Sequence, residues 1–514
     1  MALLRSAATV GGYTFASRIL GFVRDILIAA VLGAGPLADA FFVAFRFPNL
    51  FRRLVAEGAF AAAFVPLFSR HLERDGSDAA QCFAEATLAV MLAALLLFTL
   101  AVEIAMPWLI YLIAPGFADD AGQLALAVRL TRIAFPYLLF MALAALLGAV
   151  LNALYRFAAA AAAPLLLNLV LITVLLGFAE AAKTPADALA WGVAVAGVLQ
   201  FLWLAVACAR AGMALHLPRP RLGPEVRRLL RLMWPAGLAA GVMQINLLIG
   251  TVIATLEPGA VSWLYYADRV YQLPLGVVGI AIGTALLPTL SRRLGAGEDA
   301  GALQAQARAV EVGLLLTLPA AAALMTIPGP IVSVLFARGA FAASDAQATA
   351  AALAAFAAGL PAFVLVKVLA PGFFARADTV APLKVSVVAV IANIGLSLAL
   401  FVFLGHVGIA LATTLASWLQ AGLLGGLLYR RGFLVVDGRL KARLPRAVAA
   451  SAAMATALWA LRLALAGPLA GGAVARAGGL ALLVATGLAV FFVCAHVFGA
   501  ARLGELRLAL HRRP

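Results

Sequence analysis

The chain has 514 residues, of which 65% are hydrophobic and only 12% are charged, and its formal net charge at pH 7 is +16. A surface in contact with water cannot carry so few charges, so the composition excludes an ordinary soluble domain and is typical of helices that face lipid. Nucleic-acid binding, the other interpretation of a basic chain, is disfavoured because the charges lie in short loops and not on one folded face.

About fourteen hydrophobic runs are long enough to cross a bilayer, which requires roughly 20 residues. In chain order they cover residues 8–33, 37–67, 85–113, 124–152, 159–179, 187–209, 234–256, 261–290, 308–336, 346–370, 381–404, 407–429, 446–466 and 476–499. The first run contains Arg18, Arg24 and Asp25 and lacks a small-residue cleavage site after a clean apolar core, so we interpret it as a retained membrane helix. The sequence predicts an all-α polytopic membrane protein.

The distribution of Lys and Arg over the loops predicts the orientation of these helices. If the N-terminus is cytoplasmic, most basic loop residues fall on the cytoplasmic side, and the opposite loops hold only Lys183, Arg338, Arg462 and Arg476. This is the pattern of the positive-inside rule. We therefore expect a multi-pass membrane protein with both termini in the cytoplasm.

Weak internal similarity indicates a duplication. The segment Ala63–Arg70 (AFVPLFSR) resembles Ala285–Arg292 (ALLPTLSR), and Arg156 and Pro164 are echoed by Arg376 and Pro382. The equivalent runs are six apart, an even number, so both halves have the same orientation in the membrane. We expect two six-helix lobes related by pseudo-two-fold symmetry about the membrane normal, plus two extra C-terminal helices.

This repeat sets the expected domain boundaries. The N-terminal lobe, helices 1–6, covers residues 1–213, and a cytoplasmic linker covers 214–233. The C-terminal lobe, helices 7–12, covers 234–432, and helices 13 and 14 with a cytoplasmic tail cover 433–514.

Charged residues inside the apolar runs are the strongest functional signal. A charge at the bilayer centre costs at least about 2.5 kcal/mol, so such residues face water, a partner or a ligand. Several lie on one face of the second run by helical spacing: Asp39, Arg46, Asn49, Arg53 and Glu57. The remaining candidates are Ser17, Arg18, Arg24, Asp25, Arg52, Asp268 and Arg269. Because guanidinium groups suit bidentate phosphate recognition, the set predicts a cationic cavity that receives an anionic substrate.

A purely structural network is the alternative. Asp25, Asp39, Glu57 and Asp268 are able to neutralise arginines as buried ion pairs that hold the bundle together. The arginines outnumber these acids, which leaves positive charge for a ligand. Arg53 and Glu57, one helical turn apart, are the residues best explained by a structural pair.

Other chemistries have little support in the sequence. Cys82, Cys208 and Cys494 are far apart and in or beside membrane runs, which suggests neither a disulfide framework nor a zinc site. The histidines have no metal-ligand spacing, and no loop is long enough for a soluble catalytic domain. We expect no cofactor, no metal and no enzymatic activity.

The charged runs resemble a known family. The motifs that carry the resemblance are Ser17–Asp25 (SRILGFVRD), Ala38–Phe41 (ADAF), Phe47–Leu54 (FPNLFRRL), Glu57–Ala59 (EGA), Phe64–Pro66 (FVP), Asp268–Val270 (DRV), Leu273–Gly276 (LPLG), Leu286–Pro288 (LLP) and Phe373–Arg376 (FFAR). They are similar to the signature of the MurJ (MviN) lipid II flippases. The resemblance covers essentially the whole chain, and its first sixty-six residues are the most specific.

The resemblance implies a member of the multidrug/oligosaccharidyl-lipid/polysaccharide exporter superfamily, with two lobes around a central cavity and alternating access. Its members move lipid II, an undecaprenyl-pyrophosphate-linked disaccharide-pentapeptide, from the cytoplasmic to the periplasmic leaflet for cell-wall synthesis. It also implies membrane lipid and other cell-wall synthesis proteins as candidate partners. The family's essential cavity residues correspond by position to Arg18, Arg24, Asp39, Arg52 and Arg269, with Asp25 and Asn49 in support.

Two alternatives stay open. Another exporter of the same superfamily, a polysaccharide-lipid flippase or a drug antiporter, would share the fold, although an antiporter for cations should offer acidic cavity residues. A membrane enzyme acting on lipid-linked sugars would need a nucleophile with a base or a metal group, and the Asp and Arg residues do not provide one.

Overall fold

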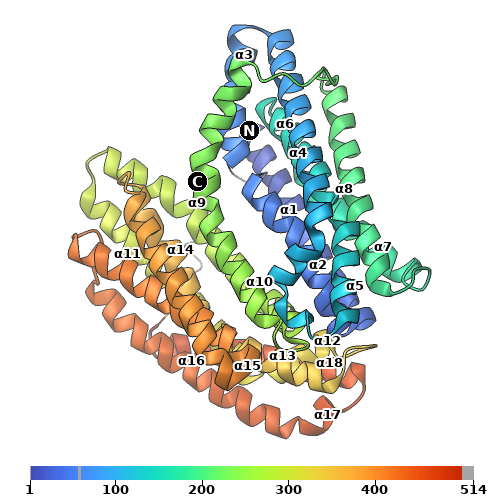
Figure 1. The fold of residues 1–514 in the computed structure, drawn as a ribbon. Helices are drawn as coiled ribbons and strands as arrows, with labels where there is room; N and C mark the ends of the chain where they lie inside the picture. Colours follow the sequence, from blue (N-terminus) through green and yellow to red (C-terminus); the bar gives the residue numbers. More distant parts are fainter. Residues whose placement is uncertain (1, 56–58, 501–514) are drawn as a thin grey trace. The chain divides into compact units, whose positions relative to one another are not determined.

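The computed structural model describes residues 2–55 and 59–500, and these residues are helical with no β-strand among them (Figure 1). The helices of the first half are α1 (Ala2–Leu32), α2 (Pro36–Val55), α3 (Ala59–Arg74), α4 (Ser77–Ile113), the 3-10 turn η1 (Pro115–Phe117), α5 (Ala121–Ala134), α6 (Tyr137–Ala153), α7 (Phe157–Gly177), α8 (Pro185–Arg210) and α9 (Pro224–Ala254). Those of the second half are α10 (Ala260–Gly295), α11 (Asp299–Thr326), α12 (Pro328–Phe336), α13 (Ala343–Ala357), α14 (Leu360–Phe374), α15 (Val380–Arg430), α16 (Gly438–Ala464), α17 (Ala466–Ala470) and α18 (Ala473–Val497).

The prediction of an all-α membrane protein is confirmed. Within the described residues, nine helical segments are long and apolar enough to cross a membrane. Each of the fourteen predicted runs overlaps at least one helix, but the number of spans stays a prediction.

Several predicted runs are divided in the structure. The run 124–152 overlaps α5 and α6, which are separated at Phe135 and Pro136, and the run 308–336 overlaps α11 and α12, which are separated before Pro328. Proline lacks a backbone N–H and cannot continue the helical hydrogen-bond ladder, which explains both positions. The adjacent runs 381–404 and 407–429 are joined in α15, which departs from helical geometry at Gly405 (φ 52°, ψ −138°). A positive φ is tolerated there because glycine has no Cβ.

The described helices form two compact units. Unit 1 extends to Ser262 and includes Arg338–Phe341, and unit 2 consists of Trp263–Ala337 and the chain from Ala342 onward. In unit 1, α7 packs against α1 and α8, α6 packs against α8, and α2 packs against α5. The predicted lobes and linker, with their boundaries at residues 213, 233 and 432, stay a prediction.

The core of unit 1 contains a column of phenylalanines. Phe60, Phe64 and Phe68 recur every four residues on α3, and their rings stack with centroid distances of 5.1 and 5.6 Å. Phe83 of α4 stacks on Phe64 at 5.4 Å. Residues four apart lie on the same helix face, so this spacing makes one side of α3 the surface that packs against α4 and α6.

The two C-terminal helices belong to unit 2, where α16 packs against α11 and α18. An apolar cluster that includes Ile327, Met454 and Leu483 joins them. Near the middle of α11, the buried carboxylate of Glu311 accepts hydrogen bonds from Arg439 (3.2 Å) and Arg443 (2.8 Å) of α16 and also bonds Arg308. This cluster fixes α16 to α11.

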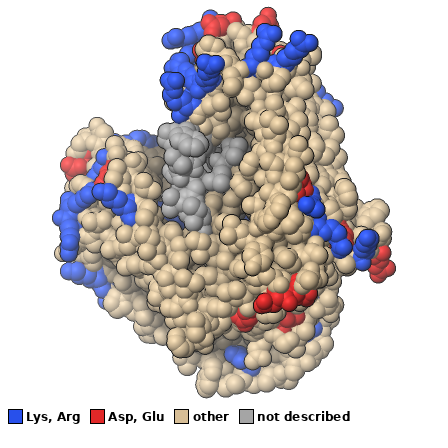
Figure 2. Space-filling view, viewed as in Figure 1, with Lys and Arg blue, Asp and Glu red and all other residues tan. Residues whose placement is uncertain are grey.

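Charge on the surface of unit 1 lies mainly toward the helix ends. Figure 2 shows basic side chains gathered where α3 ends and α9 begins, whereas the surface along the helices is mostly uncharged. The exposed residues there include Arg70, Arg74, Arg227 and Arg228. Such a distribution suits helices embedded in lipid with their basic ends in water.

Candidate functional site

Arg24 of α1 is the most deeply buried of the described candidate arginines, with only 6% of its surface exposed. Its Nε and Nη2 atoms donate to Oδ1 of Asp25 at 3.0 and 2.7 Å, and its Nη1 atom donates to Oδ1 of Asn168 in α7 at 2.9 Å. Asp25 itself is 1% exposed. The guanidinium is therefore held in a fixed orientation by a charge and a neutral acceptor on two helices.

Asn168 ties this arginine to the rest of α1. Its Nδ2 atom donates to the carbonyl oxygen of Ser17 at 2.9 Å and to Oγ of Ser17 at 3.3 Å. A Cβ added at Gly21 would lie 3.6 Å from the Asn168 amide, so a small residue there lets α7 come close to α1. Asn168 was not among the sequence candidates, and its only signal is that it is a polar residue within the apolar run 159–179.

The other basic residue of α1 differs in its surroundings. Arg18 is exposed, whereas Arg24 is buried and its guanidinium also lies 5.6 Å from the ring centroid of Phe45 in α2. Ser17, Arg24 and Asp25, which the sequence predicted as site residues, are thus brought together, and Arg18 lies on the exposed surface of the same helix.

Asp39 of α2 is completely buried, with 0% of its surface exposed. Its Oδ2 accepts a hydrogen bond from the backbone N–H of Gly259 (2.6 Å), and its Oδ1 accepts from the backbone N–H (2.8 Å) and the hydroxyl (2.5 Å) of Ser262. The first N–H groups of a helix have no partner inside the helix, and a carboxylate there is favoured by the helix dipole. Asp39 therefore caps the start of α10.

The predicted polar face of α2 contacts more than one element. Arg46 donates through Nη1 to Oγ1 of Thr251 in α9 at 3.1 Å, and Asn49 donates through Nδ2 to the carbonyl of Phe45 at 2.7 Å. Asp39 receives its hydrogen bonds from Gly259 and from Ser262 in the first turn of α10, so the two described charges of this face, Asp39 and Arg46, are engaged by different partners. The side chains of Arg52 and Arg53, and Glu57 as a whole, lie outside the described residues.

In unit 2, the candidate residues lie on α10. The guanidinium of Arg269 lies 4.6 Å from the ring centroid of Tyr265, which is one turn earlier and buried. Gln272 donates a hydrogen bond to Asp268. Tyr265 and Arg269, four residues apart on α10, form a cation–π contact, an arrangement that favours a partly desolvated guanidinium.

The contacts of Arg24 and Arg269 indicate which kind of ligand these residues are able to bind. Arg24 is a guanidinium fixed inside a membrane protein by Asp25 and Asn168, and Arg269 is a second one supported by an aromatic ring. Preorganised guanidinium groups of this kind recognise phosphate and carboxylate oxygens by charge-assisted hydrogen bonds.

The chain is similar to proteins of one known family. The family model described as lipid II flippase MurJ matches residues 28–474. A probable lipid II flippase MurJ of Rhizobium tropici is 47% identical over 519 residues, covering 100% of this chain and 97% of that protein. The lipid II flippase MurJ of Burkholderia cenocepacia is 40% identical over 443 residues, covering 84% of this chain and 85% of that protein.

Solved structures give the same fold. A lipid II flippase MurJ in an inward closed conformation matches with a TM-score of 0.80 at 22% identity, covering 95% of this chain and 98% of that one. An inward-facing multidrug resistance transporter of the MATE family matches with a TM-score of 0.69 at 14% identity, covering 81% of this chain and 95% of that one.

Proposed function

Because the chain belongs to the lipid II flippase MurJ family, we propose that it moves lipid II from the cytoplasmic to the periplasmic leaflet of the bacterial inner membrane, with both termini in the cytoplasm. The polyprenyl tail of this substrate stays in lipid. Its pyrophosphate and sugars do not cross hydrocarbon unaided, because burying charged and polar groups there costs many kcal/mol. The protein supplies a polar route for the head group and breaks no bond.

The observation that best supports this proposal is the position of Arg24. The guanidinium of Arg24 is 6% exposed inside an apolar helix and is oriented by Asp25 and Asn168. Burying a charge in this way costs free energy, and a role in substrate binding explains why the residue is there. A pyrophosphate presents the oxygens that suit its fork-like donors. Arg18 on the exposed side of α1 provides a second positive charge that meets the head group as it enters.

We further propose that Arg46, Arg52, Arg53 and Arg269 bind the head group together with Arg24, and that Asn49 and Asp268 orient them. The guanidinium of Arg269 lies 4.6 Å from the ring centroid of Tyr265, which covers one planar face of the group. In this arrangement Glu57 is a counter-ion and not a substrate ligand.

Asp39 has a different role in this proposal. Its three hydrogen bonds join α2 to the start of α10, the helix that carries Arg269 further along. In an alternating-access cycle, such a buried connection stabilises the conformation in which it is formed, and the substrate shifts the equilibrium only through contacts that differ between states. We propose that Asp39 sets this equilibrium.

The test is transport by the purified protein in vesicles. Lipid II should become accessible to an impermeant probe on the far leaflet, its structure unchanged, and Arg24→Ala should abolish this transfer. A polysaccharide-linked lipid with the same pyrophosphate is the matched substrate that distinguishes a lipid II flippase from another exporter. Equal rates for both would support the alternative.

A further inference from the structure

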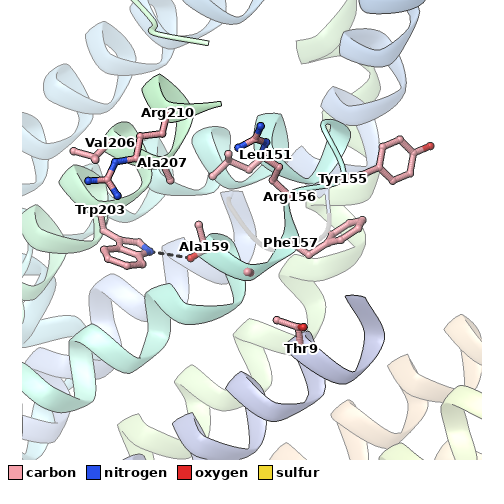
Figure 3. Close-up of a pocket in the computed structure, with 11 residues that line it drawn as sticks. Thr9, Leu151, Tyr155, Arg156, Phe157, Ala159, Trp203, Val206, Ala207 and Arg210 are labelled. Atoms are coloured by element: carbon pink, nitrogen blue, oxygen red, sulfur yellow. Dashed lines mark hydrogen bonds between the residues drawn. The ribbon is translucent and has the colours of Figure 1, made fainter. Parts of the chain in front are cut away.

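A pocket of about 480 Å³ lies in unit 1, outside the set of residues discussed above. It is formed by the connection between α6 and α7, by the last two turns of α8 and by Thr9 of α1 (Figure 3). Arg156 and Arg210 line it together with the aromatic residues Tyr155, Phe157 and Trp203.

The pocket lies at the ends of candidate membrane spans, where the membrane boundary is expected. Two candidate spans meet there, since α7 begins at Phe157 and α8 ends at Arg210. Trp203 is 46% exposed and its indole N–H donates to the carbonyl of Ala159 at 3.1 Å. Tryptophan with a bonded N–H and an open ring face is typical of the lipid–water interface. The exposed apolar side chains of Leu202 and Val206 continue along α8 beside it.

The charged side chains in the described lining of this pocket are all basic. Its lining within the described chain contains Arg156 and Arg210 and no carboxylate. Figure 3 shows the Arg210 side chain extending toward Trp203, and Arg156 across the pocket at the turn that precedes α7. An anion that occupies the space between them would meet two guanidinium groups.

The turn that lines this pocket in unit 1 has a counterpart in unit 2. The turn before α7 in unit 1 and the turn before α15 in unit 2 have the same geometry: Tyr155 and Ala377 have φ values of 59° and 58°. The next residues, Arg156 and Asp378, donate their N–H groups to the carbonyls five residues earlier at 2.8 and 3.1 Å. The backbone therefore aligns Arg156 with Asp378, and not with Arg376 as the sequence echo suggests.

In unit 2 the residue at this position is an anion, Asp378. Asp378 accepts hydrogen bonds from the backbone N–H groups of Val380 (3.1 Å) and Ala381 (2.9 Å), and from Nη1 of Arg431 (2.6 Å). The N–H of Ala381 and the Arg431 guanidinium keep the pKa of Asp378 below its usual value. In unit 1 the same position is an arginine, and the start of α7 has no side-chain cap.

We propose that the pocket lined by Arg156, Arg210 and Trp203 binds the phosphate of an anionic glycerophospholipid, which takes the place that Asp378 has in unit 2. Two guanidinium forks suit the phosphodiester oxygens, and each basic residue near an anionic membrane surface adds attraction. The exposed apolar stripe of α8 contacts the acyl chains, which is why the ligand is a membrane lipid and not free phosphate. This site is separate from the proposed route of lipid II.

The first test is native mass spectrometry of the full-length protein, delipidated in detergent and titrated with phosphatidylglycerol. The double variant Arg156→Gln/Arg210→Gln should lose one bound lipid, with an apparent dissociation constant at least about tenfold higher for that lipid. The matched control Arg227→Gln/Arg228→Gln removes the same charge from exposed positions and should bind like the wild type. Equal behaviour of the two double variants would overturn the proposal.

A second variant separates binding from folding. Arg156→Asp introduces the carboxylate that unit 2 has at this turn, where it is able to cap α7 and pair with Arg210. It should abolish the bound phosphatidylglycerol without lowering the melting temperature of the lipid-free protein. Retention of the lipid would contradict the site. Inorganic phosphate and phosphatidylcholine should compete poorly, and full competition by inorganic phosphate would contradict the assignment to a membrane lipid.

Discussion

The substitution Asp39→Asn tests whether the carboxylate that joins α2 to the start of α10 stabilises the protein. The change replaces one carboxylate oxygen by an amide donor. If the remaining oxygen stays with Ser262, the N–H of Gly259, now 2.6 Å from Oδ2, faces a donor and loses its bond. A hydrogen bond to a charged group contributes about 1.5–3 kcal/mol, and the two bonds to Ser262 lose their charge assistance. Since Asp39 is 0% exposed, water does not replace the lost partner.

We therefore expect Asp39→Asn to reduce the free energy of unfolding by about 2–3 kcal/mol. Ser262→Ala should cost about 1 kcal/mol, and the double variant should cost less than the sum because both residues belong to one network. Asp119→Asn, the same change at an exposed position of unit 1, is the control and should stay within about 0.5 kcal/mol of the wild type.

The assay is thermal or denaturant unfolding of the detergent-solubilised protein, with lipid II binding measured on the same preparation. If Asp39→Asn melts with the Asp119→Asn control while its lipid II affinity changes, the capping role is refuted and Asp39 acts on the substrate itself. Lowered stability relative to the Asp119→Asn control is the result expected from the geometry.

Three further predictions concern the same site and the topology. Arg24→Lys keeps the charge but loses the fork, so it should support partial growth of a flippase-depleted cell, whereas Arg24→Ala at normal protein levels should support none. Asn168→Leu removes the acceptor 2.9 Å from Nη1 of Arg24 and should lower the initial transport rate in vesicles about 5- to 30-fold with little loss of expression; an unchanged rate would contradict its orienting role. Reporter fusions after Gly116, Lys183 and Arg338 should be periplasmic, and those after Arg74, Arg221, Asp299 and Gly438 cytoplasmic; one reversed loop would show a wrong number of spans.

The fold class and much of the site were predictable because hydropathy and charge act locally. An apolar run of membrane length becomes a helix whatever it packs against, and arginines inside such runs need a polar environment. The contact between Arg24 and Asp25 joins neighbours in the sequence. The face shared by Tyr265 and Arg269 follows from one-turn spacing along a single helix.

The partners from distant helices were not predictable. Asn168 reaches Arg24 only because α7 packs against α1, and a single asparagine in an apolar run does not reveal that packing. Asp39 bonds mainly to backbone N–H groups, which every residue has, so no sequence motif marks Gly259 and Ser262 as its partners. Helical periodicity predicts that Asp39 and Arg46 share one face of α2. It does not show that Arg46 bonds to α9 whereas Asp39 bonds to the start of α10.

The proposed flippase function is tested most directly by measuring the transfer of lipid II by the purified chain in vesicles, with lipid II chemically intact at the end. We predict that the wild-type protein exposes lipid II on the far leaflet, that Arg24→Ala reduces this transfer to the rate of protein-free vesicles, and that the exposed-site control Arg227→Gln leaves it unchanged. Transfer by Arg24→Ala at the wild-type rate would contradict the claim that this buried guanidinium carries the substrate's pyrophosphate.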